Sequence, residues 1–277
     1  MKKPERNPLE ISSGYDLIDT HCHLDMPGYE NLQDVLESSV RAGVRRVISV
    51  GIDVASSRKA VEIAALFPNV FAAIGIHPHA AAAAGGEMYQ TLAALLGTNK
   101  AKIVAYGEIG LDYAKKYAPR DMQLRVFRQQ LRLAGELGLP VIIHDRDAHE
   151  DILDTLKKNK PYPAGGVMHC FSGDSEMARK VIDFGFYISI PGIVTFAKSE
   201  TMQRVVRETP LAHIILESDG PFLAPVPYRG KINRPGYLVY TAGKIAELKK
   251  TSLQEVARQT TKNAEALFHL TATKTFH

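Results

Sequence analysis

Eight short apolar runs, each followed by a segment of helical length, recur along this chain of 277 residues. They are rich in Val and Ile and often apolar at successive positions, as is typical of strands buried on both faces. Strands that alternate with helices predict an α/β fold with a parallel sheet, and eight units in about 250 residues favour a closed (β/α)8 TIM barrel. The runs are Leu17–Leu24, Arg46–Gly51, Val70–His77, Ile103–Leu111, Pro140–Asp145, Gly166–Phe171, Phe186–Ile190 and Ile214–Asp219.

Local signals place two of the helices. Apolar side chains at helical spacing predict a helix over Arg120–Leu137. Ser252, with Glu255 three residues later, predicts the capped start of a last helix that ends near Phe268. Because no linker or change of composition divides the chain, we expect a polar extension at 1–16, one barrel domain at 17–270 and a tail at 271–277.

Composition restricts the class of protein. Hydrophobic residues make up 45% and charged residues 23%, the balance of a globular protein with a sizeable core. No apolar run approaches the roughly 20 residues that span a bilayer, and the start of the chain lacks the apolar stretch of a secretory signal. Cys22 and Cys170 are too few for a disulfide framework and fit a reducing cytosol. We therefore expect a cytoplasmic protein with no membrane partner.

Side chains that can bind metal gather at the downstream ends of the apolar runs. They are six of the ten histidines and two acids, namely His21, His23, His77, His79, His144, His169, Glu108 and Asp219. Imidazole nitrogens and carboxylate oxygens bind divalent transition ions at neutral pH. In a parallel barrel these strand ends open onto one face, where the chemistry of such folds sits. The pattern predicts a metal-dependent hydrolase.

The first run carries Asp19, His21 and His23 on one face, since alternate residues of a strand point the same way. A buried polar group without a partner costs about 1–3 kcal/mol, so three together indicate a ligand set or, alternatively, a hydrogen-bonded core network. Cys22 and Cys170 each follow a proposed ligand directly. The same alternation turns them to the opposite face, and we do not expect them to bind an ion.

Glu108 is expected between two groups of ligands. Its two oxygens could bridge two cations, with His144 and His169 from the next two runs on the second ion. Asp219 ends the eighth run beside the first. It could ligate the first ion, accept a proton from a bound water, or do both.

Three further residues are candidates for contacts with the substrate or a water molecule. His77 could reach the substrate or a water molecule, whereas His79 fits the site and a surface position equally well. Arg146, just past His144, offers a planar fork to an anionic substrate oxygen or forms a surface salt bridge.

Six blocks of sequence, in this order and spacing, resemble the TatD family of metal-dependent DNases in the amidohydrolase-like superfamily. The resemblance extends from about Leu17 to Phe268, nearly the whole chain. The blocks are Asp19–Asp25, Gly75–His79, Gly107–Tyr113, His144–Arg146, His169–Gly173 and Leu216–Asp219.

The resemblance implies two divalent ions per chain, of Mg, Mn or Zn. One would be held by His21, His23, Glu108 and Asp219, and the second by Glu108, His144 and His169. A hydroxide on these ions would attack a phosphodiester bond of DNA, in single strands or at ends, with Glu108 and Asp219 as catalytic residues and Asp219 as the general base. Phosphate oxygens would be contacted by His77, Arg146 and Arg229.

The segment after Arg229 departs from the family pattern. Ile232 and Arg234 stand where the family commonly has a basic residue and a carboxylate. The hydrolase core matches while this rim differs, so an ester or amide hydrolase, such as an aminoacyl-tRNA deacylase, stays open on the same site. A non-catalytic binding module is a third interpretation. The net charge of +4 suits DNA or another phosphodiester substrate, and the sequence is compatible with a monomer.

Overall fold

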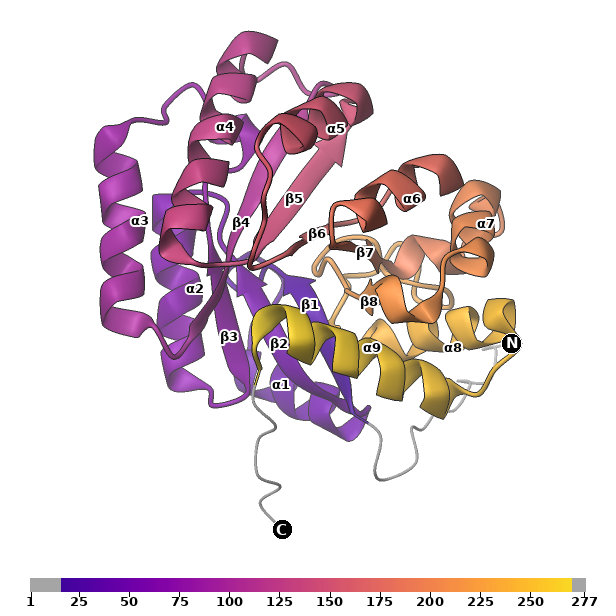
Figure 1. The fold of residues 1–277 in the computed structure, drawn as a ribbon. Coiled ribbons are helices and arrows are strands. Elements are labelled where there is room, and N and C mark those ends of the chain that lie inside the picture. The colour runs from indigo at the N-terminus through magenta and orange to yellow at the C-terminus, as the bar shows by residue number, and fades with distance from the viewer. Residues whose placement is uncertain (1–15, 271–277) are drawn as a thin grey trace.

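The computed structural model of the protein describes residues 16–270 and confirms the predicted barrel (Figure 1). Eight strands form one sheet in chain order, and each neighbouring pair is parallel. The predicted extension and tail lie outside the described residues, except for residue 16. The strands are β1 (Leu17–Cys22), β2 (Val44–Val50), β3 (Val70–Ile74), β4 (Ile103–Asp112), β5 (Val141–Arg146), β6 (Gly166–Met168), β7 (Phe186–Ile190) and β8 (Ile214–Leu216).

Helices follow the strands and cover the outside of the sheet (Figure 1). The two predicted helices are confirmed: α4 has the predicted bounds, and α9 begins after Ser252, whose hydroxyl accepts a hydrogen bond from the Glu255 N–H at 3.1 Å. None of the described helices is long and apolar enough to cross a membrane. The helices are α1 (Leu32–Arg41), α2 (Val54–Leu66), α3 (Gly86–Asn99), α4 (Arg120–Leu137), α5 (His149–Lys158), α6 (Ser175–Asp183), α7 (Glu200–Glu208), α8 (Leu238–Lys249) and α9 (Leu253–Phe268).

The barrel closes between β8 and β1 through bonds just past the short strand β8. Cys22 and Gly220 form a parallel bridge. The His23 N–H donates to the Gly220 carbonyl at 2.7 Å, and the Asp219 N–H donates to the His21 carbonyl at 2.9 Å. Closure therefore places Asp219 beside the two histidines of the first strand.

Several strands end earlier than the apolar runs predict. His23, His77, His169 and Asp219 lie one to three residues beyond β1, β3, β6 and β8. In contrast, β4 continues four residues past Glu108. The predicted ends were wrong because an apolar run records burial, and the chain stays buried for a few residues after the ladder of hydrogen bonds has ended.

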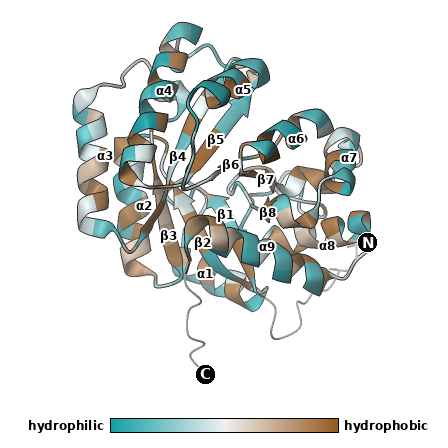
Figure 2. Ribbon diagram, in the orientation of Figure 1, coloured by the Kyte–Doolittle hydropathy of each residue, from teal (hydrophilic) through white to brown (hydrophobic). Residues whose placement is uncertain are grey.

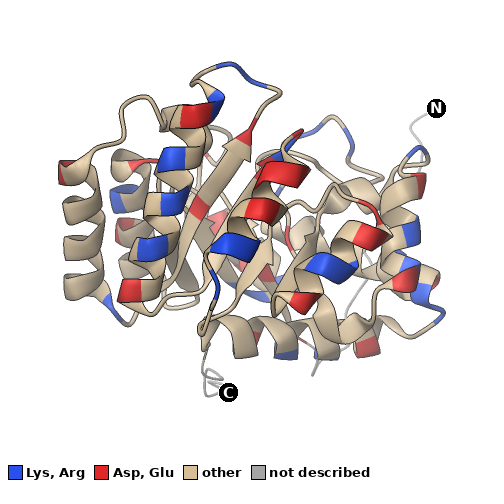
Figure 3. Cartoon of the chain, turned by 45° about the horizontal axis from the view of Figure 1, so that its top comes forward, with Lys and Arg blue, Asp and Glu red and all other residues tan. Residues whose placement is uncertain are grey.

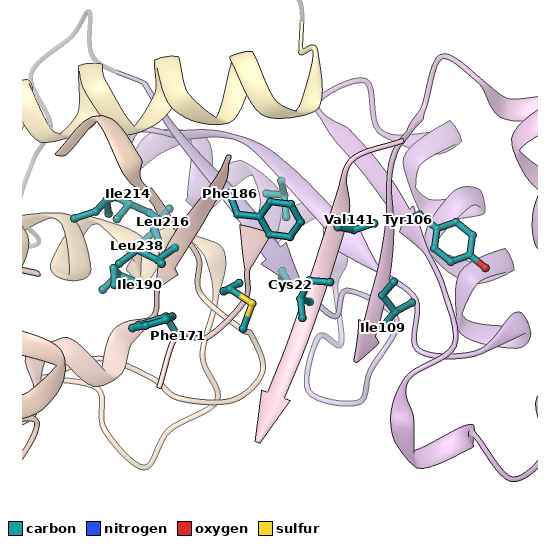
Figure 4. Close-up of a cluster of buried hydrophobic side chains, with 14 of the residues drawn as sticks. Cys22, Tyr106, Ile109, Val141, Phe171, Phe186, Ile190, Ile214, Leu216 and Leu238 are labelled. Atoms are coloured by element: carbon teal, nitrogen blue, oxygen red, sulfur yellow. The ribbon is translucent and has the colours of Figure 1, made fainter. Parts of the chain in front are cut away.

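Two apolar layers hold the barrel together. Outward-facing side chains of the strands pack against the helices in a large cluster that includes Ile109, Phe186 and Leu238 (Figure 4). Hydrophobic residues accordingly concentrate on the strands and hydrophilic residues on the outer faces of the helices (Figure 2). A second cluster joins inward-facing strand residues to Leu267 and Phe268 of α9. Helix α9 thus covers the end of the barrel at which the strands begin (Figure 1).

The long segment between β8 and α8 is fixed beside the opposite end, the mouth at which the strands finish. Asn233 is fully buried there. Its side chain donates to the Ser218 carbonyl at 2.7 Å, its N–H donates to the Pro221 carbonyl at 2.9 Å, and its carbonyl accepts from the Tyr29 hydroxyl at 3.0 Å. These bonds hold both ends of the segment at the mouth.

Candidate metal centre

Four donor atoms from β1, β4 and the end of β8 form the centre of the site. His21 Nε2 lies 3.3 Å from His23 Nε2 and 3.4 Å from Glu108 Oε2. Asp219 Oδ1 lies 3.9 Å from His21 Nε2 and 3.6 Å from His23 Nε2. Ligands about 2.0–2.1 Å from a tetrahedral ion are roughly 3.4 Å apart, so this group fits one small divalent cation.

Glu108 faces a second group of donors with its other oxygen. Oε1 lies 2.6 Å from His144 Nδ1 and 3.6 Å from His169 Nε2. His169 Nε2 is also 3.9 Å from Asp219 Oδ1. The carboxylate is almost fully buried between the two groups. Its two oxygens therefore face different imidazoles, and Glu108, His144 and His77 form a second group of donor atoms that lie within 4.8 Å of one another.

Partners behind the imidazoles orient their rings. His23 Nδ1 donates to the Val50 carbonyl at 3.0 Å, which leaves the lone pair of a neutral ring on Nε2, facing the other donors. The His21 ring stacks on that of His169, with centroids 3.5 Å apart. Asp19, expected beside them, instead accepts the Ser218 N–H at 2.8 Å and so joins β1 to the end of β8.

Glu217 is a functional candidate that the sequence prediction did not include. Its Oε2 lies 2.9 Å from His169 Nδ1, and its Oε1 accepts from the Cys170 N–H at 2.7 Å. A carboxylate partner on Nδ1 directs His169 Nε2 toward the centre and makes the ring a stronger ligand. The signal in the sequence is an acid directly after the apolar strand β8, where a buried charge requires a partner.

Neighbouring groups of opposite charge change the pKa values of the buried side chains of the site. Burial alone would raise the pKa of the Glu108 and Asp219 carboxyls, but the surrounding imidazoles lower both below their ordinary values. Burial alone would lower the pKa of His169 and His144. Glu217 and Glu108 instead raise that of His169 to about 10, and Asp112 and Glu108 raise that of His144 to about 9. The carboxylates thus attract positive charge, which protons or divalent cations can supply.

His77 and His79 occupy different environments. His77 is buried, its Nε2 lies 3.6 Å from Glu108 Oε1, and burial lowers its pKa to about 3, so the ring is neutral. His79 Nε2 donates to Asp112 Oδ2 at 2.8 Å. The same oxygen lies 3.3 Å from His144 Nε2. His79 is therefore outside the donor group, and Asp112 is a second residue that the sequence prediction missed.

The two candidate arginines lie exposed at the rim of the mouth. Arg146 ends β5 and forms no ion pair with the residues that the structure describes, so the alternative of a surface salt bridge is not observed. The Arg229 guanidinium lies over the Phe196 ring at 4.6 Å from its centroid. Within residues 16–270, neither arginine has a hydrogen bond or ion pair to the donor group.

The prediction for Cys170 needs correction. Alternation along a strand does not apply to it, because β6 ends at Met168 and Cys170 has φ of 45°. Its Sγ lies within 4.8 Å of ligand atoms of His169 and Asp219. Burial raises the pKa of the Cys170 thiol well above its ordinary value, which disfavours the thiolate that metal binding requires. The predicted orientation of Cys170 was thus wrong, whereas its raised pKa still disfavours it as a ligand.

Known proteins resemble the chain over nearly its full length. A match to the family described as TatD related DNase spans residues 18–269. YabD of Bacillus subtilis, described as an uncharacterized metal-dependent hydrolase, is 42% identical over 255 residues, 92% of this chain and 99% of the relative. YcfH of Escherichia coli, described in the same words, is 38% identical over 263 residues, 93% and 97% of the two chains. The solved structure of YJJV, a TatD homolog from Escherichia coli, aligns with a TM-score of 0.87 and 30% identity over 92% of this chain and 98% of its own.

Proposed function

The chain belongs to the TatD family of metal-dependent hydrolases, and we propose that it cleaves phosphodiester bonds of DNA, in single strands or at ends, with two divalent ions. The family description and the names of the relatives support this proposal. A site inside the mouth of a barrel suits a splayed end, because an intact duplex is too wide to enter it.

The position of Glu108 between two groups of imidazoles is the observation that carries the proposal. Its Oε2 faces the imidazole of His21 on β1, and its Oε1 faces those of His144 on β5 and His169 just after β6. We assign His21, His23, Glu108 and Asp219 to one ion and Glu108, His144 and His169 to the second. When bound, such ions stabilise charge on phosphoryl oxygens and lower the pKa of a coordinated water.

Asp219 is the side chain best placed to accept a proton. The side chain of Asp219 is 13% exposed, against 4% for Glu108, so it can reach a water molecule on the substrate side. Although burial would raise its pKa, the imidazole of His23 and its neighbours lower it, which keeps the carboxylate ionised at neutral pH. We assign Asp219 as general base and ligand, and Glu108 as the bridging ligand.

The remaining assignments concern the substrate. Neutral His77, next to Glu108, would donate to a phosphate oxygen inside the mouth. Within residues 16–270, Arg146 has no ionic partner and Arg229 stacks on Phe196 without an ion pair, so both can bind phosphate oxygens without breaking one.

The apolar rim favours a second candidate function. Phe222, Val226 and Ile232 expose large hydrophobic side chains on the segment after β8. Such a surface suits the non-phosphate part of an ester or amide substrate, as in an aminoacyl-tRNA deacylase.

The two functions are separated by one comparison. Protein stripped of metal and resupplied with Mg²⁺, Mn²⁺ or Zn²⁺ is given labelled single-stranded DNA and D-aminoacyl-tRNA in parallel. Metal-dependent release of nucleotides supports the DNase, and release of amino acid alone supports the deacylase. Asp219→Asn should abolish either activity, whereas Asp183→Asn, an exposed acid on α6, should match the wild type. Failure on both substrates contradicts both assignments.

A further inference from the structure

Tyr117 is a large exposed residue that contacts His79, next to the candidate metal centre. The residue is 64% exposed, and the centroid of its ring lies 4.6 Å from that of His79. His79 shares the Asp112 carboxylate with His144, a proposed ligand. Tyr117 thus presents an exposed aromatic ring that is connected to His144 through His79 and Asp112.

The loop that carries Tyr117, residues 113–119, is fixed at both ends. Asp112 Oδ1 accepts the Lys115 N–H at 2.9 Å. The buried Gln123 amide donates to the carbonyls of Asp112 at 3.0 Å and Ala118 at 2.9 Å, and its oxygen accepts the Asp112 N–H at 2.9 Å. The backbone that carries the ring is therefore held in place before any ligand binds, which lowers the entropic cost of binding.

The same loop supplies positive charge without a partner. Lys115 and Lys116 are exposed and form no ion pair with any residue in the described range 16–270, whereas Arg120 is engaged by both oxygens of Asp151. Basic positions mark the loop where it enters α4, at the top of Figure 3. The two lysines line a hollow of about 390 Å³ together with Pro119 and the first turn of α4.

We propose that the 113–119 loop is a nucleotide subsite, in which Tyr117 stacks on an unpaired base and Lys115 and Lys116 neutralise its phosphates. An exposed ring beside unpaired cations is the combination that binds single-stranded nucleic acid without sequence preference. The base must be unpaired, because bases inside a duplex offer no free face. The inference rests on the proposed function and assigns residues that would hold the single strand or frayed end outside the metal centre.

The test measures binding separately from hydrolysis. Fluorescein-labelled phosphorothioate hexamers of thymidine and of uridine are titrated with the metal-loaded protein, and fluorescence anisotropy gives Kd. Tyr117→Ala should raise Kd about tenfold, a loss typical of one stacked base, while Tyr117→Phe should retain the affinity. Leu66→Ala, which alters an exposed apolar residue at the end of α2, is the matched control and should equal the wild type.

Salt dependence tests the lysines. Lys115→Gln/Lys116→Gln should reduce the slope of log Kd against log salt concentration by about 1.4, since each phosphate contact to a single strand contributes roughly 0.7. Lys157→Gln/Lys262→Gln removes the same charge from exposed positions of α5 and α9 and should leave the slope unchanged.

The outcomes separate the subsite from the activity. No binding by the wild type, or a Kd for Tyr117→Ala within twofold of it on both hexamers, overturns the inference. An effect on one hexamer only supports it and tells DNA from RNA. If binding depends on Tyr117 but the unmodified hexamers are never cleaved, the subsite stands and the proposed hydrolysis fails.

Discussion

The two ends of the barrel bury opposite kinds of side chain. Where the strands begin, Ile48, Ile142 and Ile215 point inward and pack against Leu267 and Phe268 of α9. Where the strands finish, the space between them is filled by imidazoles and carboxylates that are buried to a similar degree. The first end gains free energy from burial, about 25 cal/mol for each Å² of apolar surface.

Burying charged side chains at the mouth costs free energy, and the same charges allow the mouth to bind cations. The buried carboxylates of Glu108, Asp219 and Glu217 are tolerated because each lies within 3.6 Å of an imidazole nitrogen. The ionised carboxylates of Glu108 and Asp219 attract cations to the mouth. The end where the strands begin, which α9 covers, lacks these carboxylates. Stability and chemistry are thus assigned to opposite ends of one sheet, and substitutions at the two ends should have separable effects.

The largest loss of activity is expected from a substitution of Glu108, the proposed bridging ligand. Glu108→Gln should reduce hydrolysis to background and weaken both ion sites, because a neutral amide removes the charge that both cations require. Activity assays and ion titration measure this, and a normal circular dichroism spectrum would exclude misfolding. Turnover near that of the wild type would rule out a bridging role for Glu108.

A substitution at the end where the strands begin should change the stability of the protein and leave ion binding unchanged. Phe268→Ala should cost about 3–5 kcal/mol of unfolding free energy, because a fully buried ring leaves a cavity. Urea unfolding measures the loss. At low denaturant the folded protein should bind as many ions as the wild type, and loss of ions without loss of stability would show that the two ends are not independent.

A smaller effect is expected from the partner of a ligand. Glu217→Gln should weaken binding of the second ion roughly 10–100-fold, because the His169 ring loses the carboxylate that fixes its tautomer. Ion titration followed by calorimetry measures the change, with Asp183→Asn as the matched control. An affinity equal to that of the wild type would mean that Glu217 only supports the fold.

Ion binding should also release protons from the unsubstituted protein. In the ion-free site the pKa values of about 10 for His169 and 9 for His144 lie above neutrality, so both rings carry a proton that a cation must displace. Ion affinity should therefore rise with pH up to about 10, by at most about tenfold per unit for each proton. Calorimetry in buffers of different ionisation enthalpy counts the protons, and no release at pH 7.5 would contradict the charge balance described above.

Features encoded in neighbouring residues could be predicted from the sequence. The apolar runs give the number and order of the strands, and the Ser252 cap gives the start of α9. Contacts between distant segments could not be predicted. Glu217 orients His169 from 48 residues away, and Asp112 meets His79 across 33. The orientation of Cys170 could not be predicted, because the pattern of residue types does not show the backbone geometry that follows a strand.

Anomalous diffraction from crystals loaded with zinc would locate the ions themselves. We predict two peaks roughly 3.5–4 Å apart, one on each side of the Glu108 carboxylate, with His21 and His23 on the first and His144 and His169 on the second. A single peak at full occupancy, or two peaks that do not share Glu108, would contradict the assignment of this mouth as a two-ion centre.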